Sequence, residues 1–173
     1  MAKKTTKIIL IDADVVSHFI QGGEIYALGS IYPNKIKVLD KVYAELERFP
    51  KKKTEVDNLL NQGILELEKF PDSNHEIRKE YLWIKKMMFK GDGESACLAV
   101  ARYNQNIIAS SNLKDIKSYC KLHNVEYFTT MNFLCEALKN GLFDSARCDR
   151  FIAKVIQKGG KLPVSKMEDY QCE

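Results

Sequence analysis

Two aspartates follow the first apolar run of the chain. Residues 8–11 are Ile-Ile-Leu-Ile, and Asp12 and Asp14 come directly after them, separated by one residue. A continuous apolar run is typical of a parallel strand that is covered on both faces. A carboxylate at the end of such a strand is costly to bury unless it is paired or binds a cation. The chemistry that this pattern indicates is cation binding at a strand end.

Side chains with oxygen donors recur at three later points. Glu45 lies one turn into a helix expected after a second strand, and Asp92 and Glu94 lie at the start of a later helix. The third group follows another buried strand and consists of Ser110, Ser111, Asn112 and Asp115. Ligands of an open parallel sheet bind outside the carboxyl ends of its strands, so we expect all these groups to meet at one edge. Oxygen donors without His or Cys favour Mg²⁺ or Mn²⁺ over Zn²⁺.

Each acid alone also has an ordinary structural explanation. An Asx turn accounts for Asp12 or Asp14. Glu45 reads equally well as a solvated helix residue, and Asp92 as a helix cap. A position at the start of a helix suits the charge of an acid such as Asp115. Because a cap or a turn does not require the other groups, the coincidence of the four placements favours a shared site.

Strand and helix signals alternate along the chain, and these elements must position the acids. Strands are expected at 7–12, 35–40, 64–70, 106–110 and 125–129. Helices are expected at 41–49, 54–63, 74–89, 91–103, 114–123, 131–141 and 149–160. This order predicts a three-layer α/β/α fold with a mostly parallel sheet of about five strands and the acidic site at its carboxyl edge. We expect one domain over 1–143, with a helix and tail at 144–173 packed on it.

The bulk properties restrict the class of protein. The 173 residues carry a net charge of +4, which permits an anionic partner such as a nucleic acid without requiring one. An odd number of cysteines without a Cys-x-x-Cys motif predicts reduced thiols in the cytosol. These cysteines are Cys97, Cys120, Cys135, Cys148 and Cys172. No apolar run is long enough for a membrane span, and the first run meets Asp12 too soon for a signal peptide, so we expect a cytoplasmic protein with no membrane partner.

The acidic residues lie in motifs that resemble those of the PIN-domain nucleases, a family that includes many bacterial toxin ribonucleases. The family's opening motif, hydrophobic-Asp-x-[Asn/Asp/Ser]-hydrophobic, is similar to LIDADVV, which puts Asp12 on the first metal ligand and Asp14 on the supporting position. The motif of the second acid resembles VYAELER and its Glu45. A Gly-acid-x-Glu-x-Ala helix start resembles GDGESACLAVA, so the third ligand is Asp92 or Glu94.

One segment departs from the family pattern. The stretch IIASSNLKDI corresponds to a segment that usually reads Thr-x-Asp, which places Ser110 on the hydroxyl position and Asn112 on the acid position. A neutral amide would hold a second metal more weakly, and Asp115, one helical turn further on, is the candidate substitute. The resemblance covers roughly residues 7–143.

The resemblance implies a cytoplasmic endoribonuclease that uses one or two Mg²⁺ or Mn²⁺ ions and leaves 5′-phosphate and 3′-hydroxyl ends. It gives catalytic roles to Asp12, Glu45, Asp92, Glu94, Asn112 and Asp115, with Asp14 and Ser110 as support. The metal ligands among them would be Asp12, Asp92, Glu94 and Asp115. Backbone contacts to RNA would come from Lys51, Lys52, Lys53, Lys85, Lys86 and Lys90, which are otherwise a solvated charged surface. A neutralising antitoxin-like protein is the expected partner, and a homodimer stays open.

Two other functions remain open on the sequence. IDADVV and IIASSN also resemble two motifs of haloacid-dehalogenase-type phosphohydrolases, with Asp12 as nucleophile. That family needs a later Lys and an Asp pair closing another strand, whereas the last expected strand ends in Thr129 and Thr130. The other alternative is a PIN-like module that binds RNA or protein without cleaving, because Asn112 replaces a ligand. The nuclease accounts for more of the acids.

Overall fold

A central strand, β1, organises a parallel five-stranded sheet in the computed structural model, which describes residues 6–88 and 90–173. The strands are β1 (Ile9–Ile11), β2 (Ile36–Leu39), β3 (Glu66–Glu68), β4 (Ile107–Ala109) and β5 (Tyr127–Phe128). Their order is β3-β2-β1-β4-β5, and every neighbouring pair is parallel. The fold is therefore the three-layer α/β/α arrangement with a parallel sheet that the sequence predicted.

The order of the strands creates a switch point at β1. The chain moves from β1 outward to β2 and β3, and then crosses back to form β4 on the other side of β1. Ile9 pairs with Ile36 of β2 and with Ile107 of β4, and β1 is fully buried. In such sheets the crevice outside the carboxyl ends of the two strands at the switch point is the usual ligand site. The residues after β1 and β4 therefore flank that crevice.

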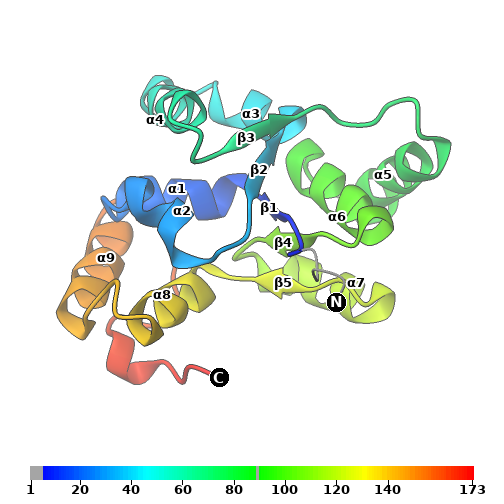
Figure 1. Ribbon diagram of the computed structural model, residues 1–173. Helices are drawn as coiled ribbons and strands as arrows, with labels where there is room; N and C mark the ends of the chain where they lie inside the picture. Colours follow the sequence, from blue (N-terminus) through cyan, green and yellow to red (C-terminus); the bar gives the residue numbers. More distant parts are fainter. Residues whose placement is uncertain (1–5, 89) are drawn as a thin grey trace, which may run out of the picture.

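Helices cover both faces of the sheet. Their bounds are α1 (Ala13–Gln21), α2 (Leu28–Ile31), α3 (Asp40–Leu46), α4 (Pro50–Asn61), α5 (His75–Met88), α6 (Asp92–Asn104), α7 (Leu113–His123), α8 (Thr130–Lys139) and α9 (Ser145–Gln157), with 3₁₀ turns at Ile25–Ala27 and Met167–Asp169. Figure 1 shows α1, α2, α8 and α9 on one side of the sheet, α5, α6 and α7 on the other, and α3 and α4 beside β3. Residue 89, where a predicted helix ended, and residues 1–5 of the predicted domain lie outside the described residues.

Helix α6 is the buried helix that brings acids to the sheet edge. Its residues 95–101 are all buried, and it contacts β1, β2 and β4. The helix leads directly into β4, so its C-terminus lies at the amino edge of the sheet and its N-terminus at the carboxyl edge. The sequence prediction made Asp92 the N-cap, but the structure has Gly91 there and Asp92 as the first helical residue. Side chains in the first turn of α6 thus reach the switch point.

The segment after β1 differs from the sequence analysis, which described no helix between the first two strands. Strand β1 ends at Ile11, and Asp12 is the N-cap of α1, accepting the Ala13 N–H at 2.8 Å. Val15, Val16 and Phe19 form the buried stripe of this helix. In the sequence, the polar residues at 14, 17 and 18 fall outside that stripe, so the spacing over 13–20 is typical of an amphipathic helix.

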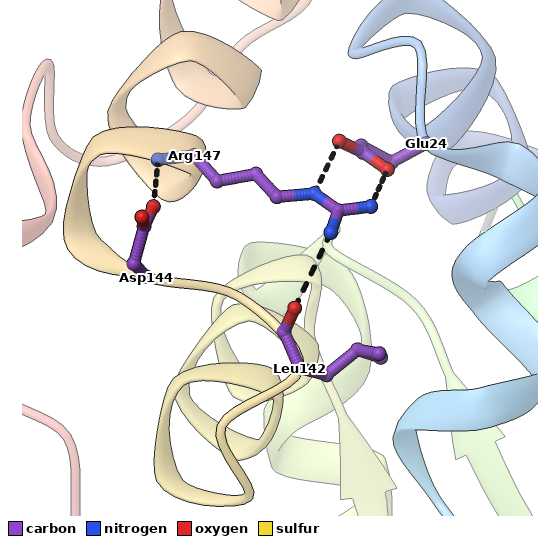
Figure 2. A network of polar contacts seen from close by, with 4 residues as sticks. All are labelled: Glu24, Leu142, Asp144 and Arg147. Carbon is purple, nitrogen blue, oxygen red and sulfur yellow. Dashed lines mark hydrogen bonds and ion pairs between the residues drawn. The ribbon is translucent and has the colours of Figure 1, made fainter.

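The C-terminal residues pack on the same body as the sheet. Phe151 of α9 meets Phe19 of α1 with ring centroids 5.0 Å apart. Figure 2 shows how the N-terminus of α9 is fixed: Arg147 Nε and Nη2 each donate to the Glu24 carboxylate at 2.7 Å, and Nη1 donates to Leu142 O at 3.3 Å. The Arg147 N–H donates to Asp144, the N-cap of α9. These contacts tie α9 to the turn that follows α1.

A disulfide joins Cys135 of α8 to Cys172 near the end of the chain. The prediction that the thiols are reduced is therefore wrong for this pair, whereas Cys97, Cys120 and Cys148 are free and buried. The sequence did not indicate the bond because its partners are 37 residues apart and one lies in a tail without a recognisable pattern. Of the helices formed by the described residues, none has the length and apolar character needed to span a bilayer.

Candidate functional site at the carboxyl edge of the sheet

Four carboxylates gather where β1 and β4 end. Asp12 is only 7% exposed, and its N–H donates to Ala109 O at 2.9 Å, which continues the pairing of the two strands. Burial raises the pKa of Asp12 well above its ordinary value, and neighbouring carboxylates raise it further. Those neighbours are Asp14, Glu94 and Glu45. Carboxylates from α1, α3 and α6 thus lie near enough to Asp12 to repel its charge.

Asp14 connects α1 to the loop after β4. Its Oδ2 accepts the Ser111 N–H at 2.8 Å, and Ser110, which is fully buried, also hydrogen-bonds to it. Burial raises the pKa of Asp14, and the hydrogen bonds from Ser111, Val15 and Ser110 oppose that rise. This carboxylate holds the two loops of the switch point together.

Glu45 of α3 holds the N-terminus of α6. Its Oε1 accepts the Gly93 N–H at 2.9 Å, one of the amide groups that an α-helix leaves unpaired in its first turn. A Cβ at position 93 would lie 2.8 Å from Glu45 Oε2 and 3.1 Å from Val42 Cγ2. Glycine at 93 is therefore what allows the Glu45 carboxylate to approach the helix so closely.

Glu94 is the least satisfied of these acids. Burial raises its pKa to about 7; the charges of Asp115, Asp14 and Glu45 act in the same direction, and Lys90 opposes them. Its Oε1 is a buried acceptor without a hydrogen-bond partner among the described residues. A half-buried carboxylate in this state favours either a proton or a cation at that oxygen.

Lys90 and Asp115 lie at the rim of the same cluster. Lys90 Nζ is 3.3 Å from Asp115 Oδ1, and the lysine side chain is only 6% exposed. Asn112 Nδ2 donates to Asp115 Oδ2. Burial raises the pKa of Asp115, but the hydrogen bonds from Asn112 and Lys90 outweigh it, so the pKa is lowered overall. Asn112 and Asp115 thus belong to one hydrogen-bonded group at the start of α7.

Asp92 lies apart from these acids. Its exposed carboxylate pairs with Lys85 Nζ and accepts the Tyr81 hydroxyl at 3.0 Å, both on α5. The hydrogen bond from Lys85 lowers its pKa. Of the two candidates for a third ligand, the structure brings Glu94 and not Asp92 to the switch point.

A chain of polar side chains behind Asp14 was not predicted from the sequence. His18 Nδ1 and Thr130 Oγ1 are 2.8 Å apart, and Thr130 Oγ1 and Ser111 Oγ are 2.7 Å apart. The Thr130 N–H also donates to Ser111 Oγ at 2.9 Å. Asp14 and His18 are four residues apart on α1 and so share one helix face. That spacing was the available signal, but it required knowing that α1 is a helix.

The lysines proposed from the resemblance to contact RNA lie on separate elements. Lys51, Lys52 and Lys53 are on α4, where Lys53 pairs with Asp57 at 2.6 Å. The ammonium of Lys52 lies 4.6 Å from the centre of the Phe49 ring. Lys85 and Lys86 are on α5, and Lys90 is in the loop before α6. Lys90 is therefore the member of this set that contacts the acidic cluster directly.

The donor chemistry of the cluster fits a divalent cation. The side chains offer carboxylate oxygens, three of the carboxyl groups have raised pKa values, and one buried oxygen has no partner among residues 6–88 and 90–173. Within those ranges no three His, Cys, Asp or Glu side chains are already arranged to hold a metal ion. A cation would therefore have to draw the carboxylates together.

Comparison of the chain with protein-family models and with curated proteins gives no match.

Proposed function

We propose that the chain is a metal-dependent ribonuclease that hydrolyses phosphodiester bonds at the carboxyl edge of β1 and β4. The observation that carries this proposal is the group of carboxylates at the switch point, where Asp12 is buried and Glu94 keeps a buried oxygen without a partner among the described residues. Acids that serve only the fold are normally paired with a cation or fully hydrogen-bonded. Here burial and mutual repulsion raise the pKa values of Asp12 and Glu94, and Glu94 Oε1 has no partner among the described residues.

Each acid has a distinct role in this proposal. Asp12 and Glu94 would hold the cation, and Asp14 would keep the loop after β4 in place through Ser111. Oε1 of Glu45 accepts the Gly93 N–H, so Oε2 is the oxygen that would ligate the cation or accept a proton from the attacking water. A bound Mg²⁺ or Mn²⁺ supplies charge neutralisation for the phosphate and promotes ionisation of water.

Lys90 and Asn112 would meet the substrate. The Lys90 ammonium lies beside Asp115 and close enough to Glu94 to influence its pKa, so it is well placed to contact a phosphate oxygen near the acids. The Asn112 amide lies on the other side of Asp115. If its ion pair with Lys90 opens, Asp115 would become a further ligand of the cation.

The resemblance to PIN-domain nucleases supports RNA as the substrate class. It also extends the proposal to a toxin-like role with a small neutralising protein as partner, a cytoplasmic location and the option of a homodimer. The Cys135–Cys172 bond argues against the cytoplasmic location, because structural disulfides are uncommon in a reducing cytosol.

Cleavage of a labelled single-stranded RNA with Mn²⁺ or Mg²⁺, and with EDTA instead, tests the function. Asp12→Asn and Glu94→Gln should lower the rate at least about a hundredfold. Asp92→Asn is the matched control: its exposed pair with Lys85 contributes little, so the rate should change by less than about threefold. A loss of activity in Asp92→Asn with none in Glu94→Gln would contradict the ligand assignment.

The same preparations separate the alternatives. Turnover of a phosphomonoester that Asp12→Asn abolishes, without RNA cleavage, would indicate a haloacid-dehalogenase-type phosphohydrolase. Metal-independent RNA binding without cleavage would indicate a binding module. Titration with Mn²⁺ gives an independent readout, because a cation bound by the folded state alone raises the melting temperature. Wild type and Asp92→Asn should show this stabilisation, and Glu94→Gln should not.

A further inference from the structure

An apolar cavity of about 320 Å³ opens beside the acidic cluster. Ser111 and Leu113 form its wall on the side of the acids, and Met131 belongs to the N-terminus of α8. Another part of the wall is the C-terminal segment, through Lys161, Leu162 and Tyr170. Its volume is at the lower end of the range for small-molecule sites, which suits a single nucleoside better than a larger ligand.

The cavity shares the residue Ser111 with the proposed catalytic edge. Ser111 lines it and donates its N–H to Asp14 Oδ2 at 2.8 Å. Leu113, on the same wall, follows Asn112, whose amide donates to Asp115. A chain whose phosphate lies at the acids therefore has this cavity beside it, on the other side of Ser111.

The lining matches one unit of a single-stranded nucleic acid. Leu113, Met131 and Leu162 offer apolar surface, and Tyr170 offers an aromatic ring. Lys161 adds an exposed ammonium at the wall. Proteins that hold single strands combine aromatic and apolar faces for the bases with cations for the backbone. The cavity shows both kinds of group around a space too small for a folded partner.

The C-terminal segment is fixed in place as a wall. The Met167 N–H donates to Asp149 Oδ1 of α9 at 2.7 Å, and the Met167 side chain is buried. Two residues after Tyr170, Cys172 is joined to Cys135 of α8. A preorganised wall lowers the entropy cost of binding a ligand.

We propose that this cavity binds a nucleobase of the RNA strand whose backbone lies at the acidic cluster. The inference rests on the proposed ribonuclease function and assigns to the C-terminal segment the task of forming the base site. Leu113, Met131, Leu162 and Tyr170 contact the base, and Lys161 contacts the adjoining phosphate.

Binding of 5′-mononucleotides to the full chain in EDTA tests the base site apart from catalysis. We expect saturable binding of at least one of the four nucleotides AMP, CMP, GMP and UMP. Ribose 5-phosphate, which lacks a base, should bind much more weakly. Tyr170→Ala should weaken nucleotide binding about tenfold, and Tyr170→Phe, which keeps the ring, should restore it. Equal binding of ribose 5-phosphate would overturn the inference, because a phosphate contact alone would then explain it.

A second variant pair avoids any doubt about the fold. Leu113→Glu places a negative charge in the wall at a residue already 38% exposed and should abolish nucleotide binding. Leu122→Glu makes the same change at the other end of α7, where the leucine is 77% exposed, and should leave binding unaltered. Equal melting temperatures of the two variants establish that both fold.

Cleavage kinetics separate this inference from the proposed function. Tyr170→Ala should raise KM about tenfold and leave kcat nearly unchanged, because the residue binds the strand away from the reacting bond. RNA cleavage with no nucleotide binding and no change in KM overturns the base site and leaves the ribonuclease intact. Nucleotide binding that Leu113→Glu abolishes, with no cleavage under any metal, supports the base site and overturns the ribonuclease.

Discussion

His18 is a buried histidine with an interior hydrogen-bond partner, and this combination makes stability depend on pH. Burial, with the charge of Lys52 as a smaller cause, lowers its pKa to about 4. In the unfolded chain it titrates near 6.5, so between these values the unfolded state binds more protons than the folded state. The contribution of neutral His18 to the free energy of unfolding is therefore fully present above pH 6.5. It declines by about 3 kcal/mol in total as the pH falls to 4.

Urea unfolding of wild type and His18→Gln from pH 4 to 8 measures this contribution. The variant should lose less stability than wild type between pH 6.5 and 4, because glutamine does not titrate. His123→Gln serves as the control: His123 is less buried, so this variant should retain most of the wild-type decline. Parallel pH profiles for wild type and His18→Gln would show that His18 is not the group responsible.

The sequence could predict which residues belong to the candidate site only where the strand order alone fixes their position. The rule that ligands bind at strand ends was enough to select Asp12 and Glu45. The choice between Asp92 and Glu94 depends on the rotation of α6, since residues two apart point in nearly opposite directions around a helix. Helix α6 is buried on all sides over 95–101, so its apolar pattern does not reveal which side faces the sheet edge.

At the scale of elements, the contact between α3 and α6 depends on one glycine. In Gly93→Ala the new Cβ would lie 2.8 Å from Glu45 Oε2 and 3.1 Å from the buried Val42, so the carboxylate has to shift away from the helix. Alanine favours the helix by up to about 1 kcal/mol, which partly offsets the overpacking. We expect a loss of only about 1 kcal/mol in the free energy of unfolding and about a tenfold loss of RNA cleavage.

Gly91→Ala is the matched control for this prediction. A Cβ at 91 would lie 3.5 Å from Glu45 Oε1, an ordinary contact, at an N-cap with negative φ. Its cost in stability should be comparable, below about 1 kcal/mol, but cleavage should be preserved. Chemical unfolding and a cleavage assay on both variants decide the point. Equal losses of cleavage would mean that the start of α6 matters in general and the Glu45 contact does not.

The sequence predicted the buried elements better than the amphipathic one beside the site. The strands predicted at 7–12 and 106–110 are confirmed by β1 and β4, each of which is shorter than predicted. Gly63, expected near a helix C-terminus, follows α4 with a φ of 72°. Helix α1 was missed although its apolar residues have helical spacing, because it begins directly after β1 with only Asp12 between them, so no turn separates strand from helix in the sequence. What the spacing does not reveal is the set of hydrogen bonds that Asp14 and His18 make with Ser111 and Thr130.

At the scale of the whole molecule, the switch point and the C-terminal segment lie at the same edge of the sheet and together form the proposed site. The strand order places Asp12 beside the loop after β4, and Ser111 of that loop faces Asp14. The same Ser111 lines the cavity, and residues near the end of the chain line it as well. The parts that give this edge its chemistry and its shape therefore come from opposite ends of the sequence.

The Cys135–Cys172 bond should stabilise the molecule mainly by restricting the unfolded chain. For partners 37 residues apart, the loop-entropy relation gives about 4 kcal/mol as an upper value, and about 2–4 kcal/mol is expected. The double variant Cys135→Ser/Cys172→Ser should stay folded, because α9 is held to the body by Phe151 and Arg147. Chemical unfolding with and without dithiothreitol provides the measurement. Reductant should lower wild-type stability to that of the double variant and leave the double variant unchanged, whereas an unaffected wild type would mean that the bond does not stabilise the fold.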